Sequence, residues 1–427
     1  MKIIISNTVS LNGGDFAILL SIIKILNLSF GEKTKIIVYD DYGDVAPLYY
    51  KEINYRKLLY TKYLKKSTDK SSIYSRGILK LYNIFTRQRF MLAAKYYSKG
   101  WKSISKLILS KHQKEDFNNY ASADFIISTG GTYLVENYNL NARFFDYYFT
   151  LALNKPLIFF TQSLGPFNNP QNKRAIKKIF DKACLILLRD EASLNHLKAI
   201  DVNVSKARVY SDVVFADADP KILKIAKSRS NNKSLRVAIS VRDWTFFKET
   251  SAKEGMKKYN ESIAALCEYI TTTLGGTIVF TSTCQGIIEY GKDDSKAGEN
   301  IYKLLSMEAK SNTTVDSKFH HPDELKKLIK DFDLVISTRM HFAIQSLDMG
   351  VPVLPIAYEF KTKELFSRLI NKEYISDIDT INPSALIEVF KKFMAALPIL
   401  RPELFEQVER ERQSALEVIS HLTEAVK

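Results

Sequence analysis

Cysteine is scarce in this sequence. Cys184, Cys267 and Cys284 are its three cysteines in 427 residues, and no CxxC pair occurs. Disulfide-held secreted domains and cysteine-type zinc sites need closely spaced cysteines, so neither is indicated. We therefore expect a reducing, cytosolic setting. The apolar run at the N-terminus, which is too short for a secretory signal, agrees with that setting.

Several well-known motifs are also missing. The sequence contains no GxSxG turn for serine hydrolysis and no P-loop, and the glycines that follow Asn12 lack the GxGxxG spacing of dinucleotide-binding folds. No histidine has a partner at zinc-like spacing, and the aspartates do not select a magnesium site. We therefore expect neither a metal nor a bound cofactor.

Acidic residues are nearly absent between Lys51 and Lys114. That segment holds 17 Lys and Arg against Glu52 and Asp69, so its excess of 17 − 2 = 15 equals the net charge of +15 of the whole chain. Its many aromatic residues allow two interpretations: docking to an anionic membrane surface, or a solvated helical insertion whose aromatics pack on the domain. No nucleic-acid motif accompanies the charge, so nucleic acid is not the expected partner.

Alternating strands and helices dominate the rest of the chain, which predicts an α/β fold. An apolar helix is expected over Phe16–Phe30. The expected strands are Lys2–Ser6, Lys35–Tyr39, Asp124–Ser128, Pro156–Gln162, Cys184–Leu188 and Val209–Phe215, then Leu235–Val241, Thr277–Ser282, Val315–Phe319, Leu334–Ile336 and Val351–Ala357. Residues 218–234 are polar and predict a linker. Two C-terminal helices are expected, Pro383–Ala396 and Pro402–Val426.

These elements predict two Rossmann-like domains facing a cleft, with the basic helical insertion, about 51–114, in the first domain. The predicted boundaries are 1–225 for the N-terminal domain, 226–395 for the C-terminal domain and 396–427 for a C-terminal helix. Ligands bind such sheets at the carboxyl ends of their strands, so polar residues at those ends are the candidates for a site.

The stretch from Leu334 to Lys361 holds the strongest candidates. Ser337 and Thr338 offer a helix N-cap after a buried strand, and Arg339 and His341 lie at that turn. Lys361 follows the next strand, and Arg242 ends another strand of the same half. Arginine binds carboxylate or phosphate through two parallel hydrogen bonds, so this group predicts a site for a small ligand with several negative charges. The plainer alternatives are a structural histidine and, for Arg242, an interdomain salt bridge.

A set of short motifs resembles the polysaccharide pyruvyl transferase family. They are Asn12-Gly13-Gly14-Asp15, Gly130-Gly131, Gln162-Ser163-Leu164-Gly165-Pro166-Phe167, Arg189-Asp190 with Ser193 and Leu197, Asp212 with Phe215, and Arg339-Met340-His341 with Gly350, Pro352, Tyr358 and Lys361. Their order along the chain is more specific than any one of them. Thr129 stands where many relatives carry a third glycine, and Met340 replaces the commoner leucine.

The resemblance implies a GT-B-like fold and the transfer of pyruvate from phosphoenolpyruvate to a sugar as a ketal. It implies that Arg242, Arg339, Met340, His341 and Lys361 bind phosphoenolpyruvate, with His341 and Arg339 catalytic. It further implies that the N-terminal half holds a sugar or lipid-linked acceptor, lined by Asp15, Gly130, Gly131 and Gln162. The expected location is the cytoplasm, at the inner face of the cell membrane.

Two other functions remain open at this point. A GT-B-like fold also serves glycosyltransferases that use nucleotide sugars, because a fold alone does not determine function. The basic segment also fits a non-catalytic, membrane-docking protein of polysaccharide assembly.

Overall fold

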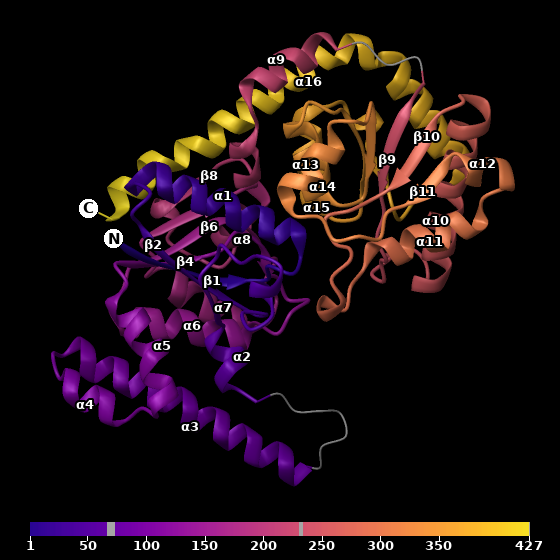
Figure 1. The fold of residues 1–427 in the computed structure, drawn as a ribbon. Coiled ribbons are helices and arrows are strands. Elements are labelled where there is room, and N and C mark those ends of the chain that lie inside the picture. Colours follow the sequence, from indigo (N-terminus) through magenta and orange to yellow (C-terminus); the bar gives the residue numbers. More distant parts are fainter. Residues whose placement is uncertain (66–72, 230–233, 427) are drawn as a thin grey trace. The chain divides into compact units, whose positions relative to one another are not determined.

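A computed structural model describes residues 1–65, 73–229 and 234–426 of the protein (Figure 1). The chain forms two compact units. The first comprises residues 1–10, 18–211 and 416–427, and the second comprises residues 11–17 and 212–415. Residues 11–17 and 212–225, which the predicted N-terminal domain included, therefore pack with the second unit.

The first unit is built on a parallel sheet with the strand order β3-β2-β1-β4-β6-β7-β8, and β5 pairs with β6. Its strands are β1 Lys2–Thr8, β2 Lys35–Asp40, β3 Tyr55–Lys57, β4 Phe125–Ser128, β5 Gly131–Leu134, β6 Leu157–Leu164, β7 Leu185–Leu188 and β8 Ala207–Val209. Ile3, Ile4 and Ile5 are fully buried, as expected for a parallel strand covered on both faces. The strand order reverses between β1 and β4, which is the switch point of a doubly wound sheet.

Helices connect these strands. They are α1 Gly13–Phe30, α2 Leu59–Tyr63, α3 Ile73–Ser98, α4 Lys102–Leu107, α5 Lys111–Ser122, α6 Leu140–Ala152, α7 Pro170–Phe180 and α8 Glu191–Lys198. Within the described part of the chain, α1 alone is long and apolar enough to cross a membrane, and half of it is buried in the protein. Such burial is equally typical of a core helix.

The second unit contains a parallel sheet with the order β11-β10-β9-β12-β13-β14. Its strands are β9 Arg236–Ser240, β10 Thr277–Phe280, β11 Thr313–Val315, β12 Leu334–Ser337, β13 Val353–Ala357 and β14 Ser376–Asp377. Its helices are α9 Pro220–Ser228, α10 Ala252–Glu268, α11 Asp294–Leu304, α12 Met307–Ser311, α13 Pro322–Ile329, α14 Met340–Asp348, α15 Phe360–Leu369 and most of α16 Pro383–Val426. The order reverses between β9 and β12, so this sheet also has a switch point. The predicted α/β class with two Rossmann-like sheets is confirmed.

The basic segment is mostly helical, as predicted, and Figure 1 shows α3 and α4 lying to one side of the first sheet. Its start, however, contributes β3, which pairs with β2. Its aromatic residues divide into two groups. Phe90 is fully buried and packs edge-on against Phe145 and Phe149 of α6, whereas Tyr74, Phe85 and Trp101 are among those that stay exposed.

The expected strand Val315–Phe319 is placed too late in the sequence, because β11 ends at Val315. Three further local predictions are wrong. The expected strand Val209–Phe215 ends at Val209, because the Asp212 side chain accepts a hydrogen bond from the Val214 N–H and starts a short 3-10 helix, Val213–Asp217. The expected linker begins with α9, where Asp219 caps the helix and Pro220 occupies its first position. The remainder of that linker includes residues 230–233, which lie outside the described residues.

The third wrong prediction concerns the C-terminus, where two expected helices form the single helix α16 with Pro398 and Pro402 inside it. A proline removes one backbone hydrogen bond from a helix. Buried apolar residues continue on both sides of the two prolines, from Phe393 and Leu397 to Leu404 and Phe405, so packing holds the helix together.

A buried carboxyl group connects three elements of the first unit. Asp146 of α6 accepts hydrogen bonds from Ser6 of β1 at 2.8 Å and from Tyr120 of α5 at 3.4 Å. Burial raises the pKa of Asp146 from 3.8 to about 7. The folded state thus holds this proton more tightly than the unfolded state.

We expect the free energy of unfolding to fall as the pH rises from about 4 to about 7, the interval between the unfolded and folded pKa values of Asp146. Asp146→Asn, which keeps an oxygen acceptor but cannot ionise, should be more stable than the wild type at pH 8 and equal to it at pH 4. Urea unfolding at both pH values measures this. A variant that is no more stable at pH 8 would contradict the assignment.

Candidate active site

The switch point of the second sheet carries the polar residues of the candidate site. Arg242 follows β9 after one intervening residue, and Thr338 and Arg339 follow β12 directly. Because β9 and β12 are neighbours with parallel register, both chain segments leave the sheet at the same edge. The Thr338 hydroxyl lies 2.7 Å from the Tyr259 hydroxyl of α10, which fixes the turn after β12.

Arg339 is held by a buried carboxylate. Its Nε and Nη2 donate to the two oxygens of Asp294 at 2.7 and 2.5 Å, and both side chains are largely buried. Burial alone would lower the pKa of Arg339, but Asp294 raises it well above its ordinary value. Among the described residues, none accepts a hydrogen bond from Nη1 of Arg339, so one edge of the guanidinium remains available to a ligand.

The predicted N-cap residues of α14, Ser337 and Thr338, are wrong. Arg339 itself occupies the N-cap position of α14, and its side chain makes no capping hydrogen bond. The Ser337 hydroxyl donates instead to the Arg339 carbonyl at 2.8 Å. Arg339 therefore provides no side-chain cap for the first N–H groups of α14, and the positive end of the helix dipole lies beside Arg339 and His341.

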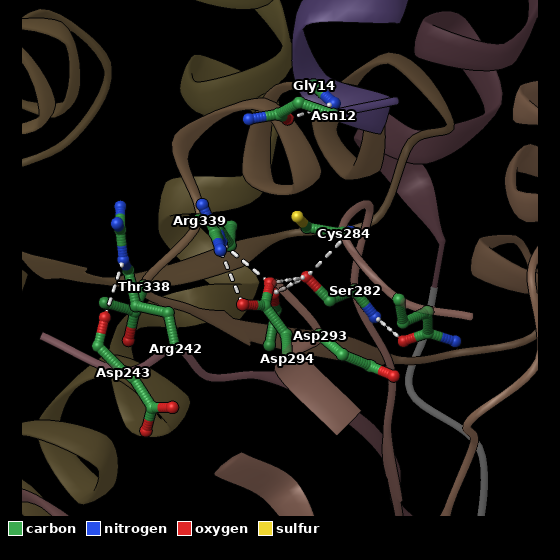
Figure 2. A network of polar contacts seen from close by, with 12 residues as sticks. Asn12, Gly14, Arg242, Asp243, Ser282, Cys284, Asp293, Asp294, Thr338 and Arg339 are labelled. Carbon is green, nitrogen blue, oxygen red and sulfur yellow. Dashed lines mark hydrogen bonds and ion pairs between the residues drawn. The ribbon is translucent and has the colours of Figure 1, made fainter. Parts of the chain in front are cut away.

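Asp294 is itself positioned by its neighbours. It is the first residue of α11, where a carboxylate is favoured by the helix dipole. Its Oδ2 accepts from the Ser282 hydroxyl at 2.6 Å, and its N–H donates to the Cys284 carbonyl at 2.8 Å. Figure 2 shows this network, with the guanidinium groups of Arg242 and Arg339 pointing to the side on which Asn12 and Gly14 lie.

One aromatic ring connects the other two cations of the site. The Arg242 guanidinium lies 4.3 Å from the centre of the Tyr358 ring, and the Lys361 ammonium lies 5.7 Å from the same ring. Trp244 packs edge-on against Tyr358 and also contacts Arg242. Lys361 pairs with Glu359 at 2.7 Å. Aromatic faces attract cations and restrict their motion, so Tyr358 gathers two positive charges at one place.

His341 lies in the first turn of α14 beside a carboxylate. Its Nε2 is 3.4 Å from Oδ2 of Asp212, and the Asp212 side chain is almost fully buried. A carboxylate at this position can orient an imidazole ring. The pair therefore has the composition of a general acid or base.

The Asn12-Gly13-Gly14 turn packs on this site. A Cβ on Gly13 would lie 2.1 Å from the Thr283 carbonyl oxygen, and a Cβ on Gly14 would lie 2.8 Å from Nδ1 of His341. Both positions thus require glycine. The Asn12 side chain accepts from the Gly14 N–H at 3.0 Å and donates to the Tyr290 hydroxyl at 3.2 Å, which fixes the turn.

Cys284 lies in the same network but is unsuited to nucleophilic chemistry. It is buried, and burial raises the pKa of its thiol to about 12. A thiol acts as a nucleophile only as the thiolate. Within the described residues, no group of three or more His, Cys, Asp or Glu side chains is arranged to hold a metal ion.

The second unit therefore brings together the predicted donor residues Arg242, Arg339, His341 and Lys361, with the Met340 side chain buried next to them. Asp15, predicted on the acceptor side, belongs with residues 11–17 to this unit and not to the one that holds Gly130, Gly131 and Gln162. Sequence reasoning missed Asp294, whose only signal was its place after a glycine-rich loop, and missed the pairing of Asp212 with His341.

In the first unit, Gly130, Gly131 and Gln162 lie together at the strand ends. The Gln162 amide donates to the Thr129 carbonyl, and Gly131 pairs with Gln162 in the sheet. Arg189 and Asp190 have structural partners: Arg189 donates to Ser163 and Thr132, and Asp190 caps α8. These contacts give Arg189 and Asp190 structural roles at the start of α8.

Comparison with known proteins agrees with this geometry. The sequence pattern described as polysaccharide pyruvyl transferase matches residues 12–359, which include both the Asn12 turn and the Arg339–His341 segment. The chain belongs to the polysaccharide pyruvyl transferase family. This membership assigns it a transferase role in polysaccharide biosynthesis.

Among relatives of this transferase, the amylovoran biosynthesis protein AmsJ of Erwinia amylovora is 25% identical over 303 residues, covering 68% of this chain and 70% of AmsJ. Two solved structures resemble it in fold. HepE of Anabaena, in complex with UDP, has a TM-score of 0.55 at 12% identity and covers 98% of this chain and 100% of its own. A UDP-N-acetylglucosamine 2-epimerase of Listeria monocytogenes has a TM-score of 0.57 at 10% identity. That match covers 99% of this chain and 95% of the epimerase. These proteins have the GT-B fold, so that prediction is confirmed.

Removing Asp294 should destabilise the second unit. Asp294→Asn would leave the buried Arg339 without its carboxylate, which costs about 3–5 kcal/mol. A Trp101→Phe background leaves Trp244 of the second unit as the sole tryptophan, so fluorescence during urea unfolding reports that unit. Glu261→Gln, which breaks the exposed pair with Lys257, is the control and should change little. Equal urea midpoints for both variants would contradict this account.

Proposed function

We propose that this transferase forms a pyruvate ketal on a sugar of a cell-surface polysaccharide or its precursor, with phosphoenolpyruvate as donor. The observation that carries the proposal is the gathering of Arg242, Arg339, Lys361 and His341 at the switch point of the second sheet. Phosphoenolpyruvate is a small molecule with a carboxylate and a phosphate. These two groups together carry about three negative charges near neutral pH, which suits the three cations Arg242, Arg339 and Lys361.

The cations divide into two groups by their environment. Arg339 is buried and held by Asp294, so its remaining Nη1 edge is a rigid donor that suits a group in one fixed position. Arg242 and Lys361 share the Tyr358 ring, and Lys361 also pairs with Glu359. We assign the phosphate to the pair on Tyr358, since it must leave during the reaction, and the carboxylate to Arg339 and the N-terminus of α14.

The reaction needs one proton donor and one proton acceptor. A proton adds to the methylene carbon of phosphoenolpyruvate, which makes the neighbouring carbon electrophilic. A sugar hydroxyl adds to that carbon and loses its proton. A second hydroxyl of the same sugar then displaces phosphate, and its proton leaves with the phosphate. The products are the pyruvate ketal and inorganic phosphate, and no oxidant or reductant is consumed.

His341 is the group that we assign to proton transfer. Protonated, it can give its proton to the methylene carbon; neutral, it can take the proton of the attacking hydroxyl. Asp212 fixes the ring orientation from the Nε2 side. Gly14 lies close to Nδ1 on the other side of the ring, which limits the motion of the imidazole. The reaction belongs in the cytoplasm, in keeping with the three free cysteines.

The donor assignment is tested by isothermal titration with phosphoenolpyruvate and, separately, with UDP-glucose. We expect the wild type to bind phosphoenolpyruvate, and Arg242→Ala and Lys361→Ala each to weaken that binding about tenfold or more, because each removes one charged contact. Arg236→Ala is the matched control, since Arg236 is an exposed arginine at the opposite end of the strand that leads to Arg242. Binding of UDP-glucose alone would favour a nucleotide-sugar glycosyltransferase and overturn the donor assignment.

The role of His341 is tested by phosphate release from phosphoenolpyruvate with methyl hexopyranosides as acceptors. His341→Ala should lower kcat about 100-fold or more with little change in the KM for phosphoenolpyruvate, because proton transfer is removed and donor binding is not. Asp212→Asn should lower kcat less, since the imidazole remains. An unchanged kcat in His341→Ala would exclude it as the proton-transfer group.

A further inference from the structure

The first unit has a polar cluster at its own switch point, between β1 and β4. Asn7 is the second-to-last residue of β1. Its φ of 67° is a left-handed conformation that asparagine tolerates better than most residues. Thr129 follows β4 directly, and its N–H donates to the Ser6 carbonyl at 3.0 Å. Ligands of doubly wound sheets bind at this position.

Arg143 of α6 lies over this cluster. Its Nη1 donates to Oδ1 of Asn7 at 3.1 Å, and its guanidinium lies 4.8 Å from the Tyr133 ring centre and 5.9 Å from that of Tyr60. Within the described residues, Arg143 has no carboxylate at ion-pair distance and uses one of its five N–H donors. Two aromatic rings and one amide therefore hold a half-buried arginine, and the carboxylates of Asp41 and Asp146 act on its charge only from beyond ion-pair distance.

Gly131 leaves room for the Tyr133 ring to lie beside Arg143. Its φ of 122° is a conformation reserved for glycine, and a Cβ there would lie 2.7 Å from the Tyr133 ring. Without a side chain at Gly131, the Tyr133 ring can turn back toward its own strand and reach Arg143. The paired glycines thus position a cation rather than form an ordinary turn.

Three buried polar atoms beside Arg143 have no hydrogen-bond partner in the described part of the chain. They are Nδ2 of Asn7, Oγ1 of Thr129 and Oε1 of Gln162, on residues that are at most 1% exposed. The Gln162 amide donates to the Thr129 carbonyl, so the three residues are contiguous. Burying such groups without partners costs about 1–3 kcal/mol each, a cost that a bound ligand with hydroxyl groups would remove.

We propose that this cluster is the acceptor subsite and that it recognises an acidic sugar. Arg143 binds a carboxylate or phosphate group, and Asn7, Thr129 and Gln162 bind sugar hydroxyls. The proposal rests on the proposed pyruvyl transfer, in which a sugar is the acceptor. The anionic group is either the carboxylate of a uronic acid or the phosphate of a phosphorylated or lipid-linked sugar. The guanidinium of Arg143 can bind either group through two hydrogen bonds.

The test measures the affinity of the full chain for methyl glucuronoside, glucose 1-phosphate and the neutral methyl glucoside, by isothermal titration at low salt. We expect at least one charged sugar to bind about tenfold more tightly than the neutral one, and Arg143→Gln to remove that preference. Preference for the glucuronoside identifies a carboxylate, and preference for glucose 1-phosphate identifies a phosphate. Arg143→Lys should retain part of this preference, which would show that the protein folds with a substituted residue at this position.

Arg174→Gln of α7 is the matched control, because Arg174 is an exposed arginine of the same unit, and it should keep the full preference. Titration of Arg143→Gln with phosphoenolpyruvate separates this proposal from the donor assignment, since donor binding should be unchanged. A wild type without preference for either charged sugar, or an Arg143→Gln variant that keeps the preference, would overturn the acidic-sugar site even if phosphoenolpyruvate binds.

A separate observation concerns the surface of α3 and α4. Much of the exposed large apolar surface lies on these two helices: Tyr74, Ile78, Leu81, Tyr82, Ile84, Phe85, Leu92, Ile104 and Leu107. At the 3.6-residue period of a helix, Tyr74, Ile78, Leu81, Phe85 and Leu92 fall on one face of α3. An exposed apolar face of this length is typical of an interaction surface.

The charge on these helices indicates the partner. Neither α3 nor α4 contains Asp or Glu, whereas α3 carries Arg76, Lys80, Arg87, Arg89 and Lys95, and α4 carries Lys102 and Lys106. Apolar residues on one face with cations beside them match the boundary of an anionic bilayer, where the apolar side chains enter the lipid and the cations contact the headgroups. We infer that α3 and α4 dock the transferase on an anionic membrane surface.

Co-sedimentation with vesicles tests this docking. The wild type should bind phosphatidylcholine vesicles containing phosphatidylglycerol, bind pure phosphatidylcholine vesicles more weakly, and lose binding as salt rises. The double variant Leu81→Ser with Phe85→Ser should lose most binding, whereas Ile225→Ser with Ile288→Ser, which alters exposed apolar residues elsewhere, should not. Retained binding by the first variant, or dimerisation through this face with no vesicle binding, would contradict the inference.

Discussion

The buried ion pair between Arg339 and Asp294 is the constraint on which the second unit's site depends. Two hydrogen bonds fix the guanidinium, and α11 and Ser282 fix the carboxylate, so the available edge of Arg339 has one orientation. A ligand anion meets a donor that has already lost its side-chain freedom, which lowers the entropic cost of binding. The Arg339 side chain does not cap α14, and the same turn places His341 beside Asp212, so one short segment carries the groups that we propose for anion binding and proton transfer.

The two units share one arrangement of residues near the reversal of their strand order. Each sheet reverses its strand order once, and each carries an arginine with aromatic neighbours near that reversal: Arg242 with Tyr358 in the second unit and Arg143 with Tyr133 in the first. Aromatic rings hold a guanidinium without neutralising it, whereas Asp294 holds Arg339 and offsets part of its charge. Arg339 is therefore a rigid anchor held by a carboxylate, whereas Arg242 and Arg143 are held by aromatic rings.

The sequence predicted the fold class because parallel strands buried on both faces give unmistakable apolar runs, as at Ile3–Ile5 and Leu334–Ile336. It predicted that Arg339, His341 and Lys361 lie at one edge of the second sheet, because each of them closely follows the end of a strand. It failed where distant segments decide the outcome. Asp212 was read as part of a strand because its capping bond to Val214 is not visible in apolar periodicity, and Asp294 has no pattern that marks it as a partner of Arg339. Arg143 was passed over because its helix gives no sign that Asn7 and Tyr133 meet it.

In the proposed reaction, phosphoenolpyruvate supplies a ketal carbon to a sugar. The most direct measurement incubates the full chain with phosphoenolpyruvate labelled with carbon-13 at its phosphate-bearing carbon, together with lipid-linked glycans extracted from the source's membranes, and follows the label by NMR. We expect the label to move to a ketal carbon bonded to two sugar oxygens, with one phosphate released for each ketal formed. A label that stays in phosphoenolpyruvate while an added nucleotide sugar is consumed and lengthens the same glycans would contradict the claim.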